Sequence, residues 1–228
     1  MGREKAVVLL SGGLDSTVSA CVAKREGLDI FALTIDYGQR HKRELGSAKK
    51  VAKAIGAKEH LVIRVDMAKI GGSALTDGEL RVPKSGVKPG IPITYVPARN
   101  LVFLALAVSY AEKVGAAKVY IGANSVDYSG YPDCRPEFIE AFGVAANLGT
   151  KEGVEGAGMQ IVAPLQTMNK GEIVKLGIKL GAPMHMTWSC YEGGKEACGK
   201  CDSCRLRLKG FAGAGAADPI VYINTRAR

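Results

Sequence analysis

The stretch Ser11 to Ser16, which reads Ser-Gly-Gly-Leu-Asp-Ser, constrains the fold of this 228-residue chain more than any other stretch. Five apolar residues, 6–10, stop abruptly in front of it, and apolar residues at helical spacing continue behind it over residues 17–23. This change of periodicity predicts a strand, a tight loop and a helix in succession. We therefore expect the loop to lie at the N-terminus of a helix, directly after a buried strand.

The composition of this loop favours phosphate as its ligand. Gly12 and Gly13 let the backbone approach a ligand closely, and the free N–H groups of the first helical turn would point at the same spot. Hydroxyl side chains add donors, and the carboxylate of Asp15 could hold Mg²⁺ against the phosphates. The alternative is a plain strand-to-helix turn with a Ser or Asp cap, which leaves most of these residue types unexplained.

The loop also resembles the SGGxDS pyrophosphate loop of the N-type ATP pyrophosphatases. That resemblance implies cleavage of ATP between the α and β phosphates, with transfer of AMP and release of pyrophosphate. A nucleoside-triphosphate P-loop would require G-x-x-x-x-G-K followed by Ser or Thr. Residues 194–200 have this spacing, but Cys201 follows them and no strand precedes them, so we reject a P-loop there.

The order of the remaining elements predicts an α/β fold. Further strands are expected at residues 30–35, 60–65, 118–123 and 161–165, and helices at 42–56, 101–114, 137–148 and 170–180. Asn169 is a good cap for the last of these helices, and residues 152–158 are predicted to be a glycine-rich loop. Strands separated by helices of this length form parallel β-α-β units, so we expect a doubly wound, mostly parallel sheet of the adenine nucleotide alpha hydrolase type.

Bulk composition limits the class of protein. Hydrophobic residues make up 47% of the chain and charged residues 23%, as in an ordinary soluble globule. A net charge of +9 is spread along the chain and suggests polyanionic substrates or partners, such as nucleotides. The apolar run near the start is too short for a signal peptide, and residues 101–108 are far too few to span a membrane. We expect a cytoplasmic protein, whose six cysteines serve metal binding or catalysis before disulfides.

Polar residues follow several of the predicted strands. Ligands gather at the carboxyl ends of the strands in parallel sheets, so residues 36–41 should share an edge with the glycine loop. His41 could touch a phosphate or the adenine, although a surface histidine is as plausible. Residues 71–97 are rich in glycine and proline and are typical of a lid or binding element, with disorder as the alternative.

Two further features point to an anionic or polar ligand. Arg99 falls in the first turn of a predicted helix, where the helix dipole does not favour a cation, so an anionic ligand is one explanation and a surface arginine the other. Residues 124–136 follow a core strand and combine carboxylates, tyrosines and an arginine. Turn formation explains the glycine and prolines there better than it explains the charged residues.

The four cysteines Cys190, Cys198, Cys201 and Cys204 have the spacing C-x7-C-x2-C-x2-C. Four thiolates this close suit tetrahedral Zn²⁺, and a site closed by four protein ligands favours a structural role. An iron–sulfur cluster is the competing interpretation. We therefore divide the chain into an ATP pyrophosphatase domain, 1–183, and a small C-terminal zinc-binding appendage, 184–228.

Taken together, several stretches of the chain resemble the 7-cyano-7-deazaguanine synthases of the queuosine and archaeosine pathways. The stretches that carry the resemblance are residues 9–19, 36–41, 96–100, 127–135 and 187–191, together with the three later cysteines. The resemblance implies that 7-carboxy-7-deazaguanine, ammonia and ATP are converted to the 7-cyano compound, with Zn²⁺ on the four cysteines and Mg²⁺ with ATP. It also implies no direct nucleic-acid or membrane contact, and we expect a homodimer.

The resemblance implies three groups of site residues. ATP would be bound by Leu9, Leu10, Ser11, Gly12, Gly13, Leu14, Asp15, Ser16, Thr17, Val18 and Ser19. The deazapurine would be bound by Arg99, Asn100, Asp127, Tyr131, Asp133 and Arg135. The catalytic residues would be Asp15, Asp133 and Arg99, with Asp15 or Asp133 on Mg²⁺.

The sequence shows no glutaminase features that would supply the nitrogen of the nitrile from glutamine. Residue 2 is Gly rather than a nucleophilic Cys, and the chain has no room for a separate glutaminase domain, so we expect free ammonia. Two other functions stay open. One is a tRNA-modifying ATP pyrophosphatase that adenylates a base for thiolation, and the other is a zinc-knuckle nucleic-acid-binding module without catalysis, which would leave the ATP loop unexplained.

Overall fold

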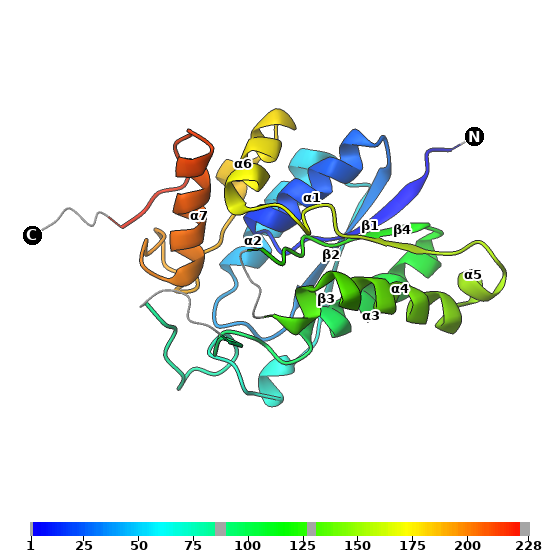
Figure 1. Ribbon diagram of the computed structural model, residues 1–228, viewed down its shortest axis with the longest axis horizontal. Helices are drawn as coiled ribbons and strands as arrows, with labels where there is room; N and C mark the ends of the chain where they lie inside the picture. Colours follow the sequence, from blue (N-terminus) through cyan, green and yellow to red (C-terminus); the bar gives the residue numbers. More distant parts are fainter. Residues whose placement is uncertain (1, 85–89, 127–130, 224–228) are drawn as a thin grey trace, which may run out of the picture.

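A computed structural model describes residues 2–84, 90–126 and 131–223. Its centre is a five-stranded sheet with the order β3-β2-β1-β4-β5, in which every paired strand is parallel (Figure 1). The strands are β1 (Lys5–Leu9), β2 (Asp29–Asp36), β3 (Glu59–Arg64), β4 (Lys118–Tyr120) and β5 (Gln160–Val162). The predicted doubly wound parallel α/β fold is confirmed.

Seven α-helices connect and cover these strands in the described residues. They are α1 (Leu14–Arg25), α2 (Arg43–Ile55), α3 (Arg99–Val114), α4 (Pro136–Gly149), α5 (Lys151–Val154), α6 (Lys170–Lys179) and α7 (Asp202–Gly213). The prediction of a loop over residues 152–158 was wrong in its first half. The Thr150 side chain accepts the Gly153 N–H at 3.3 Å and so caps the short helix α5, and the two glycines that follow form the loop.

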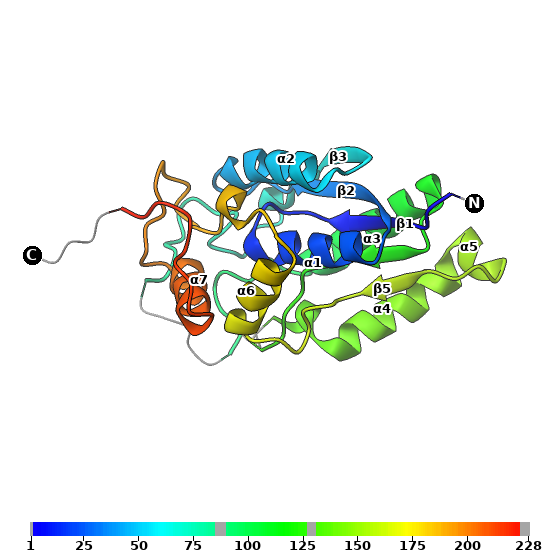
Figure 2. The same ribbon diagram turned by 90° about the horizontal axis from the view of Figure 1, so that it is seen from above.

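The sheet is buried on both faces because successive residues of its central strand point in opposite directions. Val7 and Leu9 of β1 pack with α3 and α4, whereas Ala6 and Val8 pack with α1 and α2. Figures 1 and 2 show the two helical layers on either side of the strands. This two-sided burial explains why the strand reads as a continuous apolar run.

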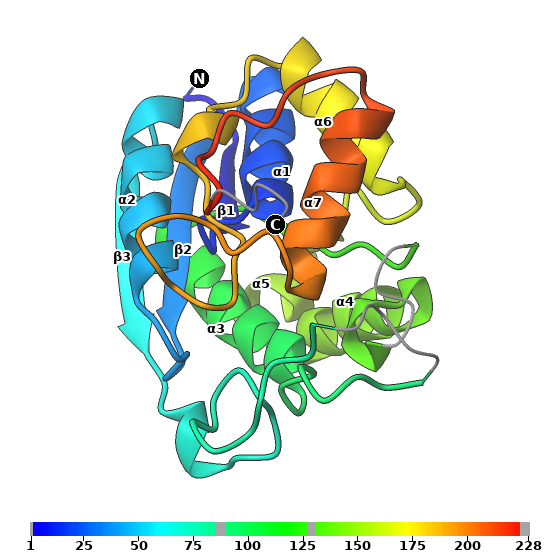
Figure 3. The same ribbon diagram turned by 90° about the vertical axis from the view of Figure 1, so that its left-hand side faces the viewer.

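Helices α6 and α7 form an additional layer outside α1. Val18 of α1 packs with Ile173 of α6 and Phe211 of α7, and the two outer helices lie side by side (Figure 3). Helix α6 begins at the predicted cap, since Asn169 accepts the Glu172 N–H and Glu172 accepts the Asn169 N–H. This layer carries the start of α6 toward the edge where β1 ends.

The strand order reverses direction between β1 and β4, and this is the point where open α/β sheets bind their ligands. Gly122, just after β4, lies against the backbone of Asp15 and Ser16 so closely that a Cβ would come within 2.7 Å of the Ser16 nitrogen. Gly12 has a positive φ of 85°, and a side chain there would collide with the backbone of α2. Both glycines therefore let the first turn of α1 sit directly in the crevice.

Among the described residues, no helix combines the length and apolar character needed to cross a membrane.

Candidate active site

A cavity of about 250 Å³ opens at the carboxyl edge of the sheet. Its walls come from the loop after β1, the segments after β2 and β4, the first turns of α3 and α6, and the segment between α6 and α7 with the start of α7. Figure 3 shows the segment between α6 and α7 in front of the ends of β1 and β2. Residues 36–41 were predicted to share this edge, and four of them, Tyr37, Gln39, Arg40 and His41, line the cavity.

The loop itself is held by its own hydroxyl groups. The Ser11 and Ser16 hydroxyls lie 3.0 Å apart, and the Gly13 N–H donates to Ser11 Oγ at 3.2 Å. Gly13 is also the N-cap of α1, and because glycine has no side chain, it caps none of the N–H groups of the first turn. Those groups are therefore available to an anion in the cavity.

The residues predicted to bind ATP divide into two sets. Seven of them line the cavity: Leu9, Leu10, Ser11, Gly13, Leu14, Asp15 and Ser16. Gly12, Thr17, Val18 and Ser19 do not line it and are buried behind the loop. The Thr17 hydroxyl donates to the Gly13 carbonyl at 2.8 Å and so fixes the turn from behind.

The carboxylate of Asp15 faces a lysine that comes from far along the chain. Lys170 Nζ donates to both carboxylate oxygens, at 2.7 and 2.9 Å, and the lysine side chain is only 6% exposed. Gly210 of α7 makes room for this lysine, because a Cβ there would overlap its stem. A buried ion pair therefore stands at the mouth of the phosphate loop.

Arg99 lies at the first position of α3 and lines the cavity. Its guanidinium donates to the Tyr37 hydroxyl at 3.5 Å and stacks over the Tyr37 and Phe103 rings, at 5.6 and 6.0 Å from their centroids. No carboxylate of the described chain forms a salt bridge with it. The predicted cation without an acidic neighbour is thus matched, and an anionic ligand would complete its coordination.

Asp133 lies behind the start of α3. Its carboxylate accepts the Asn100 N–H at 2.9 Å, and the Asn100 amide donates to the Asp133 carbonyl and to Cys134 Sγ. Burial raises the pKa of Asp133, and burial also raises the pKa of Cys134 to about 11. Asn100 and Cys134 line the cavity but Asp133 does not. The cysteine is therefore a thiol near neutral pH, which argues against a nucleophilic role.

The other predicted substrate residues are less closely grouped. Tyr131 lines the cavity, and its hydroxyl lies 3.0 Å from Thr94 Oγ1. Arg135 is exposed, stands as the N-cap of α4 and does not line the cavity. Asp127 lies outside the described residues.

The residues that line this cavity and to which sequence reasoning assigned no role include Glu44, Lys170, Trp188 and Arg207. Lys170 could have been found, since it follows the cap Asn169 shortly after the last strand, where ligands gather. Glu44 lies in the first turn of a helix, and the regular spacing of the apolar residues in that helix made it look like a surface residue. Trp188 and Arg207 flank the cysteine cluster, and the cysteine spacing gives no indication that these two residues reach the cavity.

Glu44 is a carboxylic acid set in the cavity wall. Burial raises the pKa of its carboxyl to about 7, with Arg99 opposing and Cys190 adding to this shift. Within residues 2–84, 90–126 and 131–223, the Glu44 carboxylate forms no hydrogen bond or salt bridge. It is thus a half-buried acid in the cavity wall that is open to a hydrogen-bond donor from a ligand.

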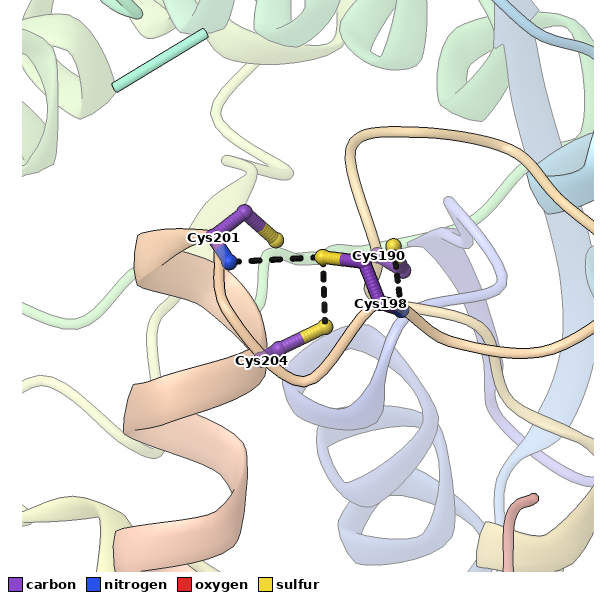
Figure 4. Close-up of side chains that lie close together, drawn as sticks. All are labelled: Cys190, Cys198, Cys201 and Cys204. Carbon is purple, nitrogen blue, oxygen red and sulfur yellow. Dashed lines mark hydrogen bonds between the residues drawn. The ribbon is translucent and has the colours of Figure 1, made fainter. Parts of the chain in front are cut away.

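The four predicted metal ligands converge between α6 and α7. The sulfur atoms of Cys190, Cys198, Cys201 and Cys204 all lie within 4.8 Å of one another (Figure 4). Backbone N–H groups of residues 192 and 198 point at Cys190 Sγ, and those of residues 200 and 201 point at Cys198 Sγ, at 3.3–3.4 Å. Four sulfurs so close could be ionised together only around a cation, so the donor set fits one tetrahedral metal ion.

The cysteine cluster is joined to the cavity by short links. The Trp188 N–H donates to the Gly12 carbonyl at 2.9 Å, and the Trp188 indole donates to the Cys190 carbonyl at 3.0 Å. The Arg43 guanidinium covers the Trp188 ring at 3.8 Å. One tryptophan therefore connects the four-cysteine cluster directly to the loop after β1.

The end of the described chain braces the same region. Arg207 is 2% exposed and forms a two-point ion pair with Asp218, at 2.8 and 3.0 Å, while its remaining donors reach Thr187 and Ser189. The Tyr222 hydroxyl also donates to Asp218, at 2.6 Å. The loop residues 74–82 pack on the cluster from the other side. These residues are part of the segment 71–97 that was predicted to be a lid or binding element, of which residues 85–89 lie outside the described residues.

Comparison with known proteins gives consistent matches over the whole chain. A family model described as "Queuosine biosynthesis protein QueC" matches residues 5–215. A 7-cyano-7-deazaguanine synthase of Azotobacter vinelandii is 57% identical over 224 residues, which cover 97% of this chain and 100% of the relative. A 7-cyano-7-deazaguanine synthase of Geotalea daltonii is 56% identical over 223 residues, which cover 96% and 97%.

Among solved structures, the chain is similar to a 4-thiouridine synthetase in a complex with RNA and bound ATP. The TM-score is 0.50 at 19% identity, and the match covers 93% of this chain and 50% of that chain. At this identity the likeness indicates a shared fold and nothing about the substrate.

Proposed function

The chain belongs to the family of the queuosine biosynthesis protein QueC, and from this membership we propose that it is a 7-cyano-7-deazaguanine synthase that works with ATP. The proposed reaction converts 7-carboxy-7-deazaguanine and ammonia to the nitrile, with release of AMP and pyrophosphate. The observation that carries the proposal is identity above one half to synthases that match this chain from end to end.

The first half of the proposed reaction makes an amide. A carboxylate resists ammonia because its leaving group would be oxide, so one carboxylate oxygen attacks the α-phosphorus of ATP and pyrophosphate departs. Ammonia then adds to the acyl adenylate carbon, loses a proton and expels AMP. The uncapped N–H groups of α1 would stabilise the charge that develops on pyrophosphate.

The second half repeats the activation on the amide. The amide oxygen attacks a second ATP, and loss of AMP together with the two amide protons leaves the nitrile. Two ATP molecules are consumed for each nitrile. Both halves need the same arrangement of an α-phosphorus beside the carbon at position 7, which is why one cavity can serve both.

Residue roles follow from the positions in the cavity. We assign ATP to the loop after β1 and the anionic end of the deazapurine to Arg99, whose guanidinium faces the cavity without a salt bridge to the described chain. Asn100, Tyr131 and Asp127 are assigned to the deazapurine, and Arg135 to the periphery of its site. Asp133 does not line the cavity, so we assign it as a positioning residue that holds Asn100 and the start of α3.

Two metal ions belong to the proposal. Mg²⁺ would be held by Asp15 and the phosphates of ATP, where it would neutralise negative charge, and this fits a carboxylate that lines the cavity beside the loop. Zn²⁺ would be held by the four cysteines as a structural ion, because four protein ligands leave no position for a substrate. Its segment, 184–228, would brace the ATP pyrophosphatase domain, 1–183.

Free ammonia is the proposed nitrogen donor, and no nucleic acid or membrane takes part. We propose a cytoplasmic homodimer. Its support is an apolar surface beside the edge strand β5, where Val144, Leu148 and Val154 are 58, 77 and 76% exposed. Sedimentation of the zinc-loaded chain at micromolar concentration would distinguish a dimer from a monomer.

Turnover of the purified, zinc-loaded chain tests the function. The chain is incubated with 7-carboxy-7-deazaguanine, ATP, Mg²⁺ and ammonium, and the products are identified by mass spectrometry. We expect the nitrile with two AMP and two pyrophosphate, and no nitrile when glutamine replaces ammonium. Intact substrate from a folded protein with full metal content would contradict the proposal and direct the search to tRNA substrates.

A further inference from the structure

Glu44 is an acidic group in the cavity wall for which the described chain supplies no hydrogen-bonding partner. It lies in the first turn of α2, lines the cavity, and its carboxylate forms no hydrogen bond or salt bridge with residues 2–84, 90–126 or 131–223. Glu44 is half-buried, so a ligand that fills the cavity would displace water from its carboxylate, and a carboxylate that loses water without gaining donors is costly. The other acid of the cavity wall, Asp15, already has Lys170. A ligand that covers Glu44 would therefore have to bring hydrogen-bond donors to it.

The surroundings of Glu44 favour neutral donors over a cation. Arg99 acts electrostatically on Glu44, and its guanidinium already lies over the Tyr37 and Phe103 rings. The Trp188 ring is likewise covered by Arg43 at 3.8 Å. Ring faces commonly bind cations, but the ring faces near Glu44 are already occupied by arginines. These arginines would repel an ammonium ion. Uncharged N–H groups would avoid this repulsion.

The proposed substrate carries such donors on one edge. In its pyrimidinone ring, the ring N–H and the adjacent 2-amino group point the same way, side by side, which matches the two oxygens of a carboxylate. We propose that Glu44 accepts these two N–H groups and thereby selects a 2-amino-4-oxo ring. This inference rests on the proposed function. It also orients the substrate, because the carboxyl group at position 7 is on the opposite ring from this edge.

The inference is tested by binding rather than by turnover. The affinity of 7-carboxy-7-deazaguanine is compared with that of the analogue that lacks the 2-amino group, using calorimetry on the zinc-loaded chain without ATP. We expect the unaltered chain to prefer the amino compound by at least roughly tenfold. Equal affinity for the two compounds would overturn the inference without any variant.

The variant Glu44→Gln keeps the size of the side chain and removes the charge and one acceptor. We expect it to weaken binding of the amino compound by roughly tenfold to a hundredfold and to bring the preference close to one. The control is Glu137→Gln, the same change in the exposed first turn of α4, which should alter neither value. A preference in Glu44→Gln equal to that of the unaltered chain would overturn the inference, as would a lower kcat with both affinities unchanged.

Failure of this inference differs from failure of the proposed function. If the unaltered chain forms the nitrile but shows no preference for the 2-amino group, only the role of Glu44 is wrong. If the folded, unaltered chain neither binds nor converts the amino compound, the proposed function fails, and the role of Glu44 fails with it.

Discussion

Lys170 donates to both carboxylate oxygens of Asp15, at 2.9 and 2.7 Å, across 155 residues of sequence. The pair joins the first turn of α6 to the first turn of α1, at the end of the phosphate loop. Such a contact fixes the carboxylate in one orientation before any nucleotide binds. It also delivers a positive charge to the place where triphosphate is proposed to lie.

We predict that Asp15 and Lys170 are energetically coupled. Asp15→Asn and Lys170→Met should each lower the free energy of unfolding by about 2 kcal/mol, less than for a fully buried pair because Asp15 retains some exposure. The double variant should lose less than the sum, with a coupling of about 1 kcal/mol or more. Urea unfolding measures all three variants.

Lys175→Met is the matched control for Lys170→Met, because Lys175 lies at an exposed position of the same helix. This substitution should change the free energy of unfolding by less than about 0.5 kcal/mol. Strict additivity of the two site variants would mean that the contact contributes nothing to folding.

The metal cluster is predicted to support the cavity as well as its own segment. Cys204→Ser should reduce zinc from one ion per chain to a small fraction and should weaken nucleotide binding, since Trp188 links Cys190 to Gly12. Metal content and nucleotide affinity are measured on the same sample. Cys21→Ala, which changes a buried cysteine in α1, should retain the zinc.

If Cys204→Ser lost its zinc but kept its nucleotide affinity, the metal would stabilise only its own segment and not the cavity. Iron with visible absorbance in the unaltered chain would instead favour the cluster reading of the four cysteines.

We predict that Asp218 stabilises the segment that carries the four cysteines through Arg207. Asp218→Asn leaves a guanidinium that is 2% exposed without its counter-charge, so the free energy of unfolding should fall by about 3 kcal/mol. Zinc release to a chelator should accelerate in the same variant. The comparison variant is Asp66→Asn, which removes an exposed pair with Lys69 and should cost below about 1 kcal/mol. Equal effects of the two variants would contradict the prediction.

The raised pKa of Glu44 predicts a component of stability that depends on pH. Burial raises its pKa from 4.5 to about 7 in the folded chain, so the folded state binds more protons than the unfolded state between these values. The free energy of unfolding contributed by this group should therefore decrease as pH rises from 4.5 through 7 and level off above. Glu44→Gln should remove this slope.

The measurement compares urea unfolding of the two proteins from pH 6 to 8 with zinc in excess, where other titrating groups affect both equally. Parallel curves for the two proteins would show that Glu44 is ionised throughout, and would contradict its burial.

The fold was predictable from local patterns. Strands such as β1 are buried on both faces, so continuous apolar runs in the sequence predict them. The capping residue Asn169 likewise predicts the start of α6. The cysteine cluster was predictable for the same reason, because its ligands lie within 15 residues of one another and their spacing is read directly from the chain.

Long-range pairs in the site were not predictable in this way. Nothing near Lys170 in the sequence indicates that its partner is Asp15, and nothing near Arg207 indicates that Asp218 folds back to meet it. Asp133 was assigned to the ligand because it lies in a polar loop, and the sequence did not indicate that its carboxylate accepts the Asn100 N–H at the start of α3. Side-chain direction depends on tertiary packing, which periodicity does not encode.

The central claim is that both oxygens of the substrate carboxylate leave on AMP, and oxygen labelling tests it most directly. 7-Carboxy-7-deazaguanine with ¹⁸O in both carboxylate positions is converted with unlabelled ATP, and the AMP is analysed by mass spectrometry. Two successive adenylations predict two AMP per nitrile, each with one ¹⁸O. Unlabelled AMP, with the label in water, phosphate or pyrophosphate, would contradict an adenylated substrate and the account built on it.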